Sequence, residues 1–478
     1  MRFERVLVLL ALLAGCTTVV PTNDARKEFS FPFVHDYSVV NHVAFDWRDE
    51  FLDADPRVYS QELAGPLSAL AACVYGYRLD MDVETLAGLG FDKDRLFRRY
   101  GNDLHYDDPV WGRDQIGFTF ATKRAFLGGE MRDVLFVLLR GTFGRTEWVS
   151  NMNACNAWGA QLEPRTEAQP PHHEGFNRAA DCVAAALAAY IASNRIDLAT
   201  AKVVVTGHSR GAAVANIIGA RLDEASDGIA PSPFAGVRRG NVFVYTFATP
   251  NSVMRTDVDV GAPRYDNIFN IINPEDMVPL VPILKWNARR YGHDLHLHDY
   301  GELGLFGALA DSGYNEMKDA FREMCGYEYW HTLFGTNSTA VVPALLGAIA
   351  PTLPDLYSVP PAQRATGNMT SIHSILETVI YRSMQDPVEE ERDISLGGDV
   401  GKLSKAYANV SDPVESADDY FYTPDGRDFS RQPGFFDIPW RLSCMHATQT
   451  YIAWMKAAER HGPAAVYKNP PFTKQDDR

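Results

Sequence analysis

The feature that most constrains the fold is the stretch VVVTGHSRGAAVAN at residues 203–216. Four β-forming residues precede the pentapeptide GHSRG, and a run rich in alanine follows it, a pattern that predicts a buried strand, a sharp turn and a helix. Gly207 and Gly211 would allow the strand and the helix to pack closely around that turn. Such a turn holds the hydroxyl of Ser209 clear of the backbone, so Ser209 is the candidate nucleophile.

Further apolar runs predict the rest of a sheet. β-branched and aromatic residues are concentrated in four segments that we expect to be strands buried on both faces, at 134–139, 203–206, 242–247 and 268–273. Segments long enough for crossover helices separate the first of these strands, at 176–193 and 212–223. Strands that alternate with helices predict an α/β protein with a doubly wound, mostly parallel sheet.

The alternation ends near residue 300, where helix-like pieces joined by Pro-rich and acidic segments begin. We interpret these pieces as a helical cap inserted into one enlarged domain, and the apolar spacing at 445–460 as a helix that returns to the core. The predicted organisation is a signal peptide at 1–15, a tether and N-terminal wrap at 16–55, the α/β core at 56–300, the helical insertion or cap at 301–434, a C-terminal core helix at 435–462 and a loose tail at 463–478.

The N-terminus has the pattern of an export signal. Arg2 and Arg5 precede an apolar run that ends in the letters LAGC. LAGC resembles the bacterial lipobox, in which cleavage before the cysteine leaves that cysteine acylated. We therefore expect an exported lipoprotein anchored to a membrane through Cys16, at the outer membrane if the cell has one. The alternative is an ordinary cleaved signal with a chance cysteine.

The charge of the chain bears on its partners. The formal net charge is −16, and Lys and Arg do not form a run. Because nucleic-acid binding needs clustered cations that neutralise phosphates, this composition argues against such a partner. Hydrophobic residues make up 46% of the chain and charged residues 22%, the balance of a globular protein with a sizeable core.

A serine hydroxyl is a good nucleophile only when a base accepts its proton, so we expect a histidine and an acid downstream of Ser209. Asp276 is the candidate acid because it follows the predicted strand at 268–273, which Pro274 would end at the carboxyl edge of the sheet. Its neighbour Glu275 is the alternative. Seven histidines follow Asp276, and their positions alone do not choose among them.

Five motifs resemble those of the class 3 lipase family and follow one another in the family's order. They are LLRGTFGRTEWVSN at 138–151, HEGF at 173–176, GHSRG at 207–211, TFATP at 246–250 and NPEDMVPLVP at 273–282. The resemblance implies an α/β-hydrolase fold and an oxyanion hole formed by the backbone N–H groups of Thr142 and Arg210. Arg210 departs from the family's usual leucine, a departure that is tolerable because the backbone amide would act there.

For the base, the segment HATQTYIAW at 446–454 resembles the HxxxxY helix start of the family's bacterial members, which implies His446. His373 lies in a segment of the same shape, and His331 lies nearer to the acid, as in the fungal members, so both remain alternatives. The histidines at 293, 296 and 298 could suggest a metal, but the pattern of 291–302 favours a polar edge strand of the core.

These expectations describe a serine hydrolase that cleaves carboxylic esters of lipids through an acyl-enzyme on Ser209, with neither a metal nor an organic cofactor. The acylated anchor favours a lipid substrate over a soluble ester. The alternatives are a phospholipase or an esterase acting on another ester and, from another class, a catalytically silent scaffold tethered to the membrane. The sequence does not determine the oligomeric state.

Overall fold

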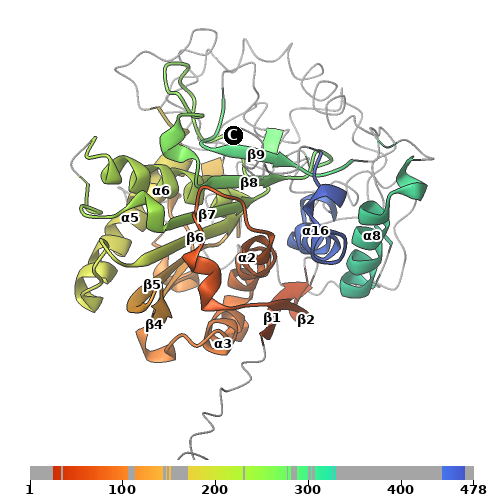
Figure 1. Ribbon diagram of the computed structural model, residues 1–478, viewed down its shortest axis with the longest axis horizontal. Coiled ribbons are helices and arrows are strands. Elements are labelled where there is room, and N and C mark those ends of the chain that lie inside the picture. Colours follow the sequence, from red (N-terminus) through yellow and green to blue (C-terminus); the bar gives the residue numbers. More distant parts are fainter. Residues whose placement is uncertain are drawn as a thin grey trace, which may run out of the picture.

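A computed structural model of the chain describes residues 25–33, 36–105, 114–143, 147, 150–151, 171–229, 232–276, 278–280, 288–299, 303, 307–326, 328–329 and 444–468, with the backbone alone at 36–39 and 102. Within these residues a seven-stranded sheet forms the centre of the molecule (Figure 1). Its spatial order is β3 (Phe97–Arg99), β4 (Phe118–Leu127), β5 (Glu130–Leu139), β6 (Lys202–His208), β7 (Val242–Phe247), β8 (Ile268–Ile272) and β9 (His293–His296).

The pairing of these strands confirms the predicted mostly parallel sheet. β3, β4 and β5 pair antiparallel, whereas every pair from β5 to β9 is parallel. The strands after β5 therefore end at the same edge of the sheet, and loops that follow them can place side chains side by side. The polar segment with the histidines forms β9, the edge strand of the sheet, as expected.

Each central strand is buried on both faces because it supplies two hydrophobic cores. All seven residues of β6 are buried, and Val203 and Val205 enter one core whereas Val204 enters the other. Successive side chains of a strand point to opposite faces, so an uninterrupted apolar run is the sequence of a strand covered on both sides.

Helices cover the two faces of the sheet in different ways. The crossover helices α5 (Glu174–Asn194) and α6 (Arg210–Ser226) pack into one core. The other core contains α2 (Gln61–Cys73) from near the start of the chain and α16 (Thr448–His461) from near its end, and these two helices contact each other (Figure 1). The packing of α16 brings the residues just before it to the carboxyl edge of the sheet.

Smaller elements complete the described part. The predicted N-terminal wrap contains a hairpin of β1 (Arg26–Phe33) and β2 (Asp36–Asp46), which packs on α2 and on α3 (Met81–Gly88). Of the predicted cap, α8 (Ser312–Cys325) is described, and it packs against α16. The other pieces of the cap between 330 and 434 lie outside the described residues, as do the signal sequence and Cys16.

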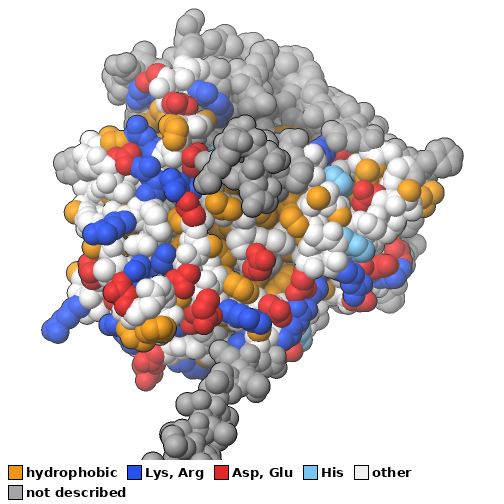
Figure 2. All heavy atoms as spheres, viewed as in Figure 1, with side chains coloured by type: hydrophobic (Ala, Val, Ile, Leu, Met, Phe, Trp, Pro, Cys, Tyr) orange, Lys and Arg blue, Asp and Glu red, His pale blue; other side chains and the backbone are white. Residues whose placement is uncertain are grey.

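The surface carries charges of both signs. Figure 2 shows Lys and Arg side chains interspersed with Asp and Glu over the face seen in that view. Several of these charges pair, as Arg98 does with Asp80 at 2.7 Å. In the part of the chain that the structure describes, no helix combines the length and the apolar character that crossing a bilayer requires.

Candidate active site

The turn at Ser209 has the geometry that its motif predicts. Ser209 lies between β6 and α6 with φ 57° and ψ −128°, a strained conformation for a residue other than glycine. A Cβ at Gly207 would lie 2.6 Å from the carbonyl carbon of Gly211, and one at Gly211 would lie 2.2 Å from the carbonyl oxygen of Leu139. Both glycines are therefore required by the close approach of β5, β6 and α6.

Three side chains from distant parts of the chain meet at this turn. His446 Nε2 lies 2.9 Å from Ser209 Oγ, and His446 Nδ1 lies 2.8 Å from Asp276 Oδ2. Ser209 follows β6, Asp276 follows β8, and His446 precedes α16. All three are buried, with 5%, 0% and 5% of Ser209, Asp276 and His446 exposed. The structure thus brings together the three residues that the sequence analysis selected as nucleophile, base and acid.

The two alternatives for the base, His331 and His373, lie outside the described residues. The alternative acid, Glu275, is buried, and its carboxylate accepts a hydrogen bond from the Tyr329 hydroxyl at 2.6 Å. Of the two neighbouring acids, Asp276 is the one in contact with His446.

The backbone of His446 is held by a second histidine that the sequence analysis did not single out. His208 Nε2 lies 2.8 Å from the carbonyl oxygen of His446, and His208 Nδ1 lies 3.0 Å from the Tyr75 hydroxyl. Burial lowers the pKa of His208 well below 6.5, as does the proximity of His446, so the ring is neutral. A carbonyl only accepts, so Nε2 carries the proton and Nδ1 accepts from Tyr75. The position of His208 inside the GHSRG motif was the sequence signal that could have pointed to this residue.

Asp276 accepts hydrogen bonds at both carboxylate oxygens. The backbone N–H of Val278 donates to Oδ1 at 2.9 Å, while the hydroxyl of Tyr451 donates to Oδ2 at 2.8 Å, beside His446. Burial, together with the nearby carboxylate, raises the pKa of Tyr451 well above 10.0, so this phenol keeps its proton and remains a donor. The tyrosine of the HxxxxY segment is therefore a direct partner of the acid.

Replacing Tyr451 with phenylalanine is expected to lower the free energy of unfolding by about 1.5–3 kcal/mol, the usual worth of a hydrogen bond to a charged group. Urea denaturation of the wild-type protein and the variant would measure this difference in the free energy of unfolding. Tyr467→Phe is a matched control, because that buried hydroxyl contacts the neutral hydroxyl of Tyr59 at 2.6 Å and its loss should cost only about 0.5–1.5 kcal/mol. Equal losses in the two variants would show that the hydrogen bond to Asp276 stabilises the fold no more than the one between the two tyrosines.

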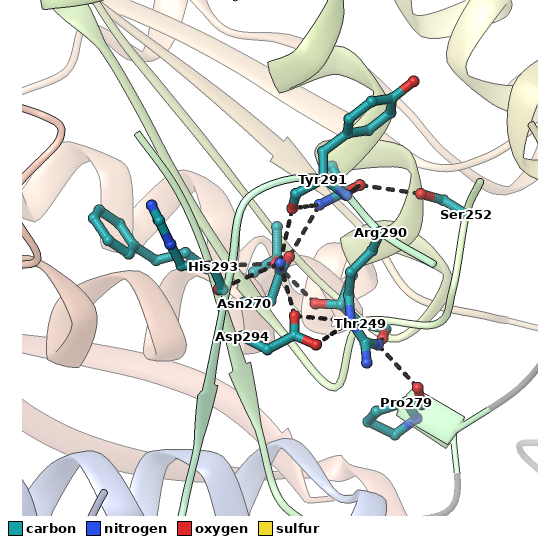
Figure 3. A network of polar contacts seen from close by, with 11 residues as sticks. Thr249, Ser252, Asn270, Pro279, Arg290, Tyr291, His293 and Asp294 are labelled. Carbon is teal, nitrogen blue, oxygen red and sulfur yellow. Dashed lines mark hydrogen bonds and ion pairs between the residues drawn. The ribbon is translucent and has the colours of Figure 1, made fainter. Parts of the chain in front are cut away.

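The loop that carries Asp276 is tied to the start of β9 by a buried arginine (Figure 3). Arg290 donates to the carbonyl oxygen of Pro279 at 2.9 Å, to the carbonyl oxygen of Thr249 and to the carboxylate of Asp294 at 2.9 Å. Thr249 belongs to the TFATP motif at the end of β7. One guanidinium therefore links two of the loops at the carboxyl edge of the sheet, which limits the movement of the acid.

The two candidate oxyanion donors lie on neighbouring segments at this edge. Leu139 pairs with Gly207 across β5 and β6, so the loop at 140–143 lies beside the turn at Ser209. A Cβ at Gly141 would lie 1.6 Å from the Tyr75 hydroxyl oxygen, which leaves room for glycine alone. Arg210 begins α6, whose N-terminal end favours negative charge. Both Thr142 and Arg210 are buried, with 5% and 1% exposed.

A buried ion pair fixes the loop that carries Thr142. Arg140 donates to Glu147 Oε1 at 2.8 Å, and the backbone N–H of Phe143 donates to Glu147 Oε2 at 2.8 Å. The guanidinium of Arg140 also lies 4.5 Å from the centre of the Phe143 ring. These contacts define the path of the backbone on both sides of Thr142.

Among the described residues, no three His, Cys, Asp or Glu side chains cluster closely enough to hold a metal ion. His293 lies 3.3 Å from Asp266 and His298 lies 3.3 Å from Asp311, so these two histidines of the β9 region face different carboxylates.

The mostly parallel sheet, with serine, histidine and aspartate meeting at its carboxyl edge, gives the chain the α/β-hydrolase fold. Residues 136–286 match the model of the family described as lipase (class 3). The match covers about a third of the chain and contains all five motifs, so it agrees with their resemblance to that family. The matched residues include Thr142, Ser209 and Asp276 and end before His446.

Comparison with solved structures finds fungal lipases among similar proteins. A triacylglycerol lipase whose catalytic centre is a serine protease triad is 17% identical, with a TM-score of 0.33, and the match covers 50% of this chain and 80% of that one. For a deletion mutant of the Rhizomucor miehei lipase in complex with its propeptide, the identity is 19%, the TM-score is 0.33, and the match covers 51% of this chain and 68% of that one. For the lipase from Rhizopus microsporus var. chinensis they are 14%, 0.32, and 50% and 75%. No curated protein matches the chain significantly.

Proposed function

We propose that this protein is a serine hydrolase that cleaves carboxylic esters of lipids through an acyl-enzyme on Ser209. The observation that carries the proposal is the continuous chain of contacts from Ser209 Oγ to His446 Nε2 at 2.9 Å and from His446 Nδ1 to Asp276 Oδ2 at 2.8 Å. An imidazole in this position can accept the serine proton while the carboxylate holds it in the useful tautomer.

In the proposed reaction, Ser209 Oγ attacks the ester carbonyl as His446 Nε2 takes its proton. The negative oxygen of the tetrahedral intermediate accepts hydrogen bonds from the backbone N–H groups of Thr142 and Arg210. His446 then donates the proton to the leaving alcohol, which departs and leaves the acyl group on Ser209. A water molecule attacks this acyl-enzyme by the same route and releases the acid.

The substrate class follows from the family and from the N-terminus. The family is named for lipases, and one of the similar solved structures is a triacylglycerol lipase. A protein held at a membrane through acyl chains on Cys16 would meet acylglycerols and phospholipids first. We therefore propose an exported, membrane-anchored enzyme with a lipid ester as substrate. Metabolic labelling with palmitate tests the anchor, and equal labelling of a Cys16→Ser variant would contradict it.

A fluorophosphonate probe tests whether the protein is a serine hydrolase at all. We expect the probe to label the wild-type protein and to leave a Ser209→Ala variant unlabelled. A folded wild-type protein that resists the probe would favour the silent scaffold instead. Hydrolysis of triacylglycerol and phospholipid emulsions of graded chain length, side by side with a soluble ester, then assigns the substrate, and a preference for the soluble ester would contradict a lipid substrate.

A further inference from the structure

The side chain of Arg210, which stands where the family usually has leucine, is buried, and both terminal nitrogens of its guanidinium donate hydrogen bonds. Only 1% of the residue is exposed, although its guanidinium is charged. It donates to the carbonyl oxygens of Asp114 at 3.1 Å and of Gln115 at 3.4 Å, and to Asn151 Oδ1 at 3.0 Å. Because burying a charge is costly unless its donors are satisfied, these contacts indicate a defined position for this side chain.

Asn151 connects this guanidinium to the other candidate oxyanion residue. Asn151 Nδ2 donates to Thr142 Oγ1 at 2.7 Å. A guanidinium has donors only, so the amide oxygen of Asn151 must face Arg210, and its NH₂ group is then directed at Thr142. The orientation of the amide is therefore fixed by its two partners. The result is a bridge of three side chains, Arg210, Asn151 and Thr142, hereafter the clamp.

We propose that Arg210 is a positioning residue for the oxyanion hole and that it acts on Thr142 through Asn151. Under the proposed function, on which this inference rests, residues 142 and 210 each contribute one backbone N–H to the hole. The clamp joins the side chains of these same two residues, so it sets the separation and direction of their N–H groups. Donors that are aligned before the reaction stabilise the oxyanion without reorganisation, and a misplacement of about 1 Å can cost about a hundredfold in rate.

Opening the clamp is expected to lower kcat with little change in KM. Asn151→Ala removes the bridge and leaves the buried guanidinium with its two carbonyl partners. Arg210→Leu installs the family's residue but removes the hydrogen bonds that the guanidinium donates to those carbonyls. We expect each variant to lose about ten- to hundredfold in kcat on a p-nitrophenyl ester, with KM within about twofold. The double variant should lose no more than the worse single variant, because both changes open the same bridge.

Two controls separate positioning from stability. Asn151→Asp keeps an acceptor for Arg210 and can accept from the Thr142 hydroxyl, so it should retain most of kcat. Arg178→Leu removes a half-exposed guanidinium that lies 3.5 Å from Asp114 without touching Asn151, and its kcat should match the wild type. The shape of the pH–rate profile should be the same in every active variant, because the contact between Ser209 and His446 is unchanged.

The outcomes are distinguishable from a failure of the proposed function. If wild-type protein shows no Ser209-dependent turnover, the proposed function fails before the clamp is tested. If the wild type is active and folded Asn151→Ala keeps kcat within twofold, or if the double variant loses the product of the single losses, the clamp is overturned while the hydrolase remains. Thermal denaturation of each variant, run beside the kinetics, identifies a loss that comes from unfolding.

Discussion

Ser209→Ala is expected to reduce kcat on a p-nitrophenyl ester by about 10⁴- to 10⁶-fold, to the level that binding and the oxyanion donors alone provide. Ser209 Oγ is the only atom of the site that would form a covalent bond with the substrate, and an alanine methyl group cannot replace it. The φ of 57° at this residue is strained and destabilises the folded state, but the surrounding contacts hold the backbone in that conformation. Alanine and serine both carry a Cβ and tolerate that conformation about equally, so the variant should keep the fold.

The contact between Ser209 and His446 makes the loss strongly non-additive. His446→Ala should lose about as much as Ser209→Ala, and the double variant no more than either, because nucleophile and base act as one unit. Ser193→Ala is a control, since Ser193 Oγ bonds the carbonyl oxygen of Tyr190 on α5. Its activity should equal that of the wild type. Turnover by Ser209→Ala within tenfold of the wild type would refute the mechanism.

Local pattern was sufficient to predict where Ser209 and Asp276 lie in the fold. The run of β-forming residues before Gly207 predicts β6, and the alanine-rich run after Gly211 predicts α6, because both elements are decided by side chains close in the sequence. Asp276 follows by the same reasoning from the apolar run that forms β8. The motif GHSRG is a further signal for this turn, because few sequences require so sharp a change of direction between a strand and a helix.

The base could not be chosen in this way. Ser209 and His446 are 237 residues apart in the chain. Their contact depends on the packing of α16 against α2, and the periodicity of a sequence does not show which distant helices pack together. The resemblance of 446–454 to family members supplied the assignment instead. The contacts of His208 and Tyr451 were also missed, because a polar side chain in a buried motif does not show from sequence which partner it faces.

The N-terminal hairpin shows a second limit. Phe29 and Phe31 alternate with polar residues and are completely buried, so the signal for β1 was present. The strand is nevertheless part of a two-stranded sheet that depends on distant elements, as in the hydrogen bond from Gln449 Nε2 to the carbonyl oxygen of Pro32 at 2.8 Å. A short alternating run becomes a strand here because α2 and α3 pack against it and α16 contributes a hydrogen bond.

Asp276→Asn is expected to lower kcat by about 10⁴-fold with little effect on KM, through the tautomer of His446. The amide has one acceptor where the carboxylate has two, and Val278 N–H and Tyr451 already occupy acceptor positions at 2.9 and 2.8 Å. If the amide oxygen serves Val278, the NH₂ group faces His446 Nδ1, which must then accept. The imidazole proton moves to Nε2, and Ser209 loses its base.

Glu275→Gln is the matched control for this prediction, because it removes the same charge from the same loop and keeps an oxygen that can accept from Tyr329. Its kcat should stay within a few-fold of the wild type, since Glu275 has no part in the proposed proton transfer. Steady-state kinetics of the two variants on one ester would decide the matter. A loss of less than tenfold in Asp276→Asn, or an equal loss in Glu275→Gln, would mean that the charge of the loop rather than the tautomer of His446 governs the rate.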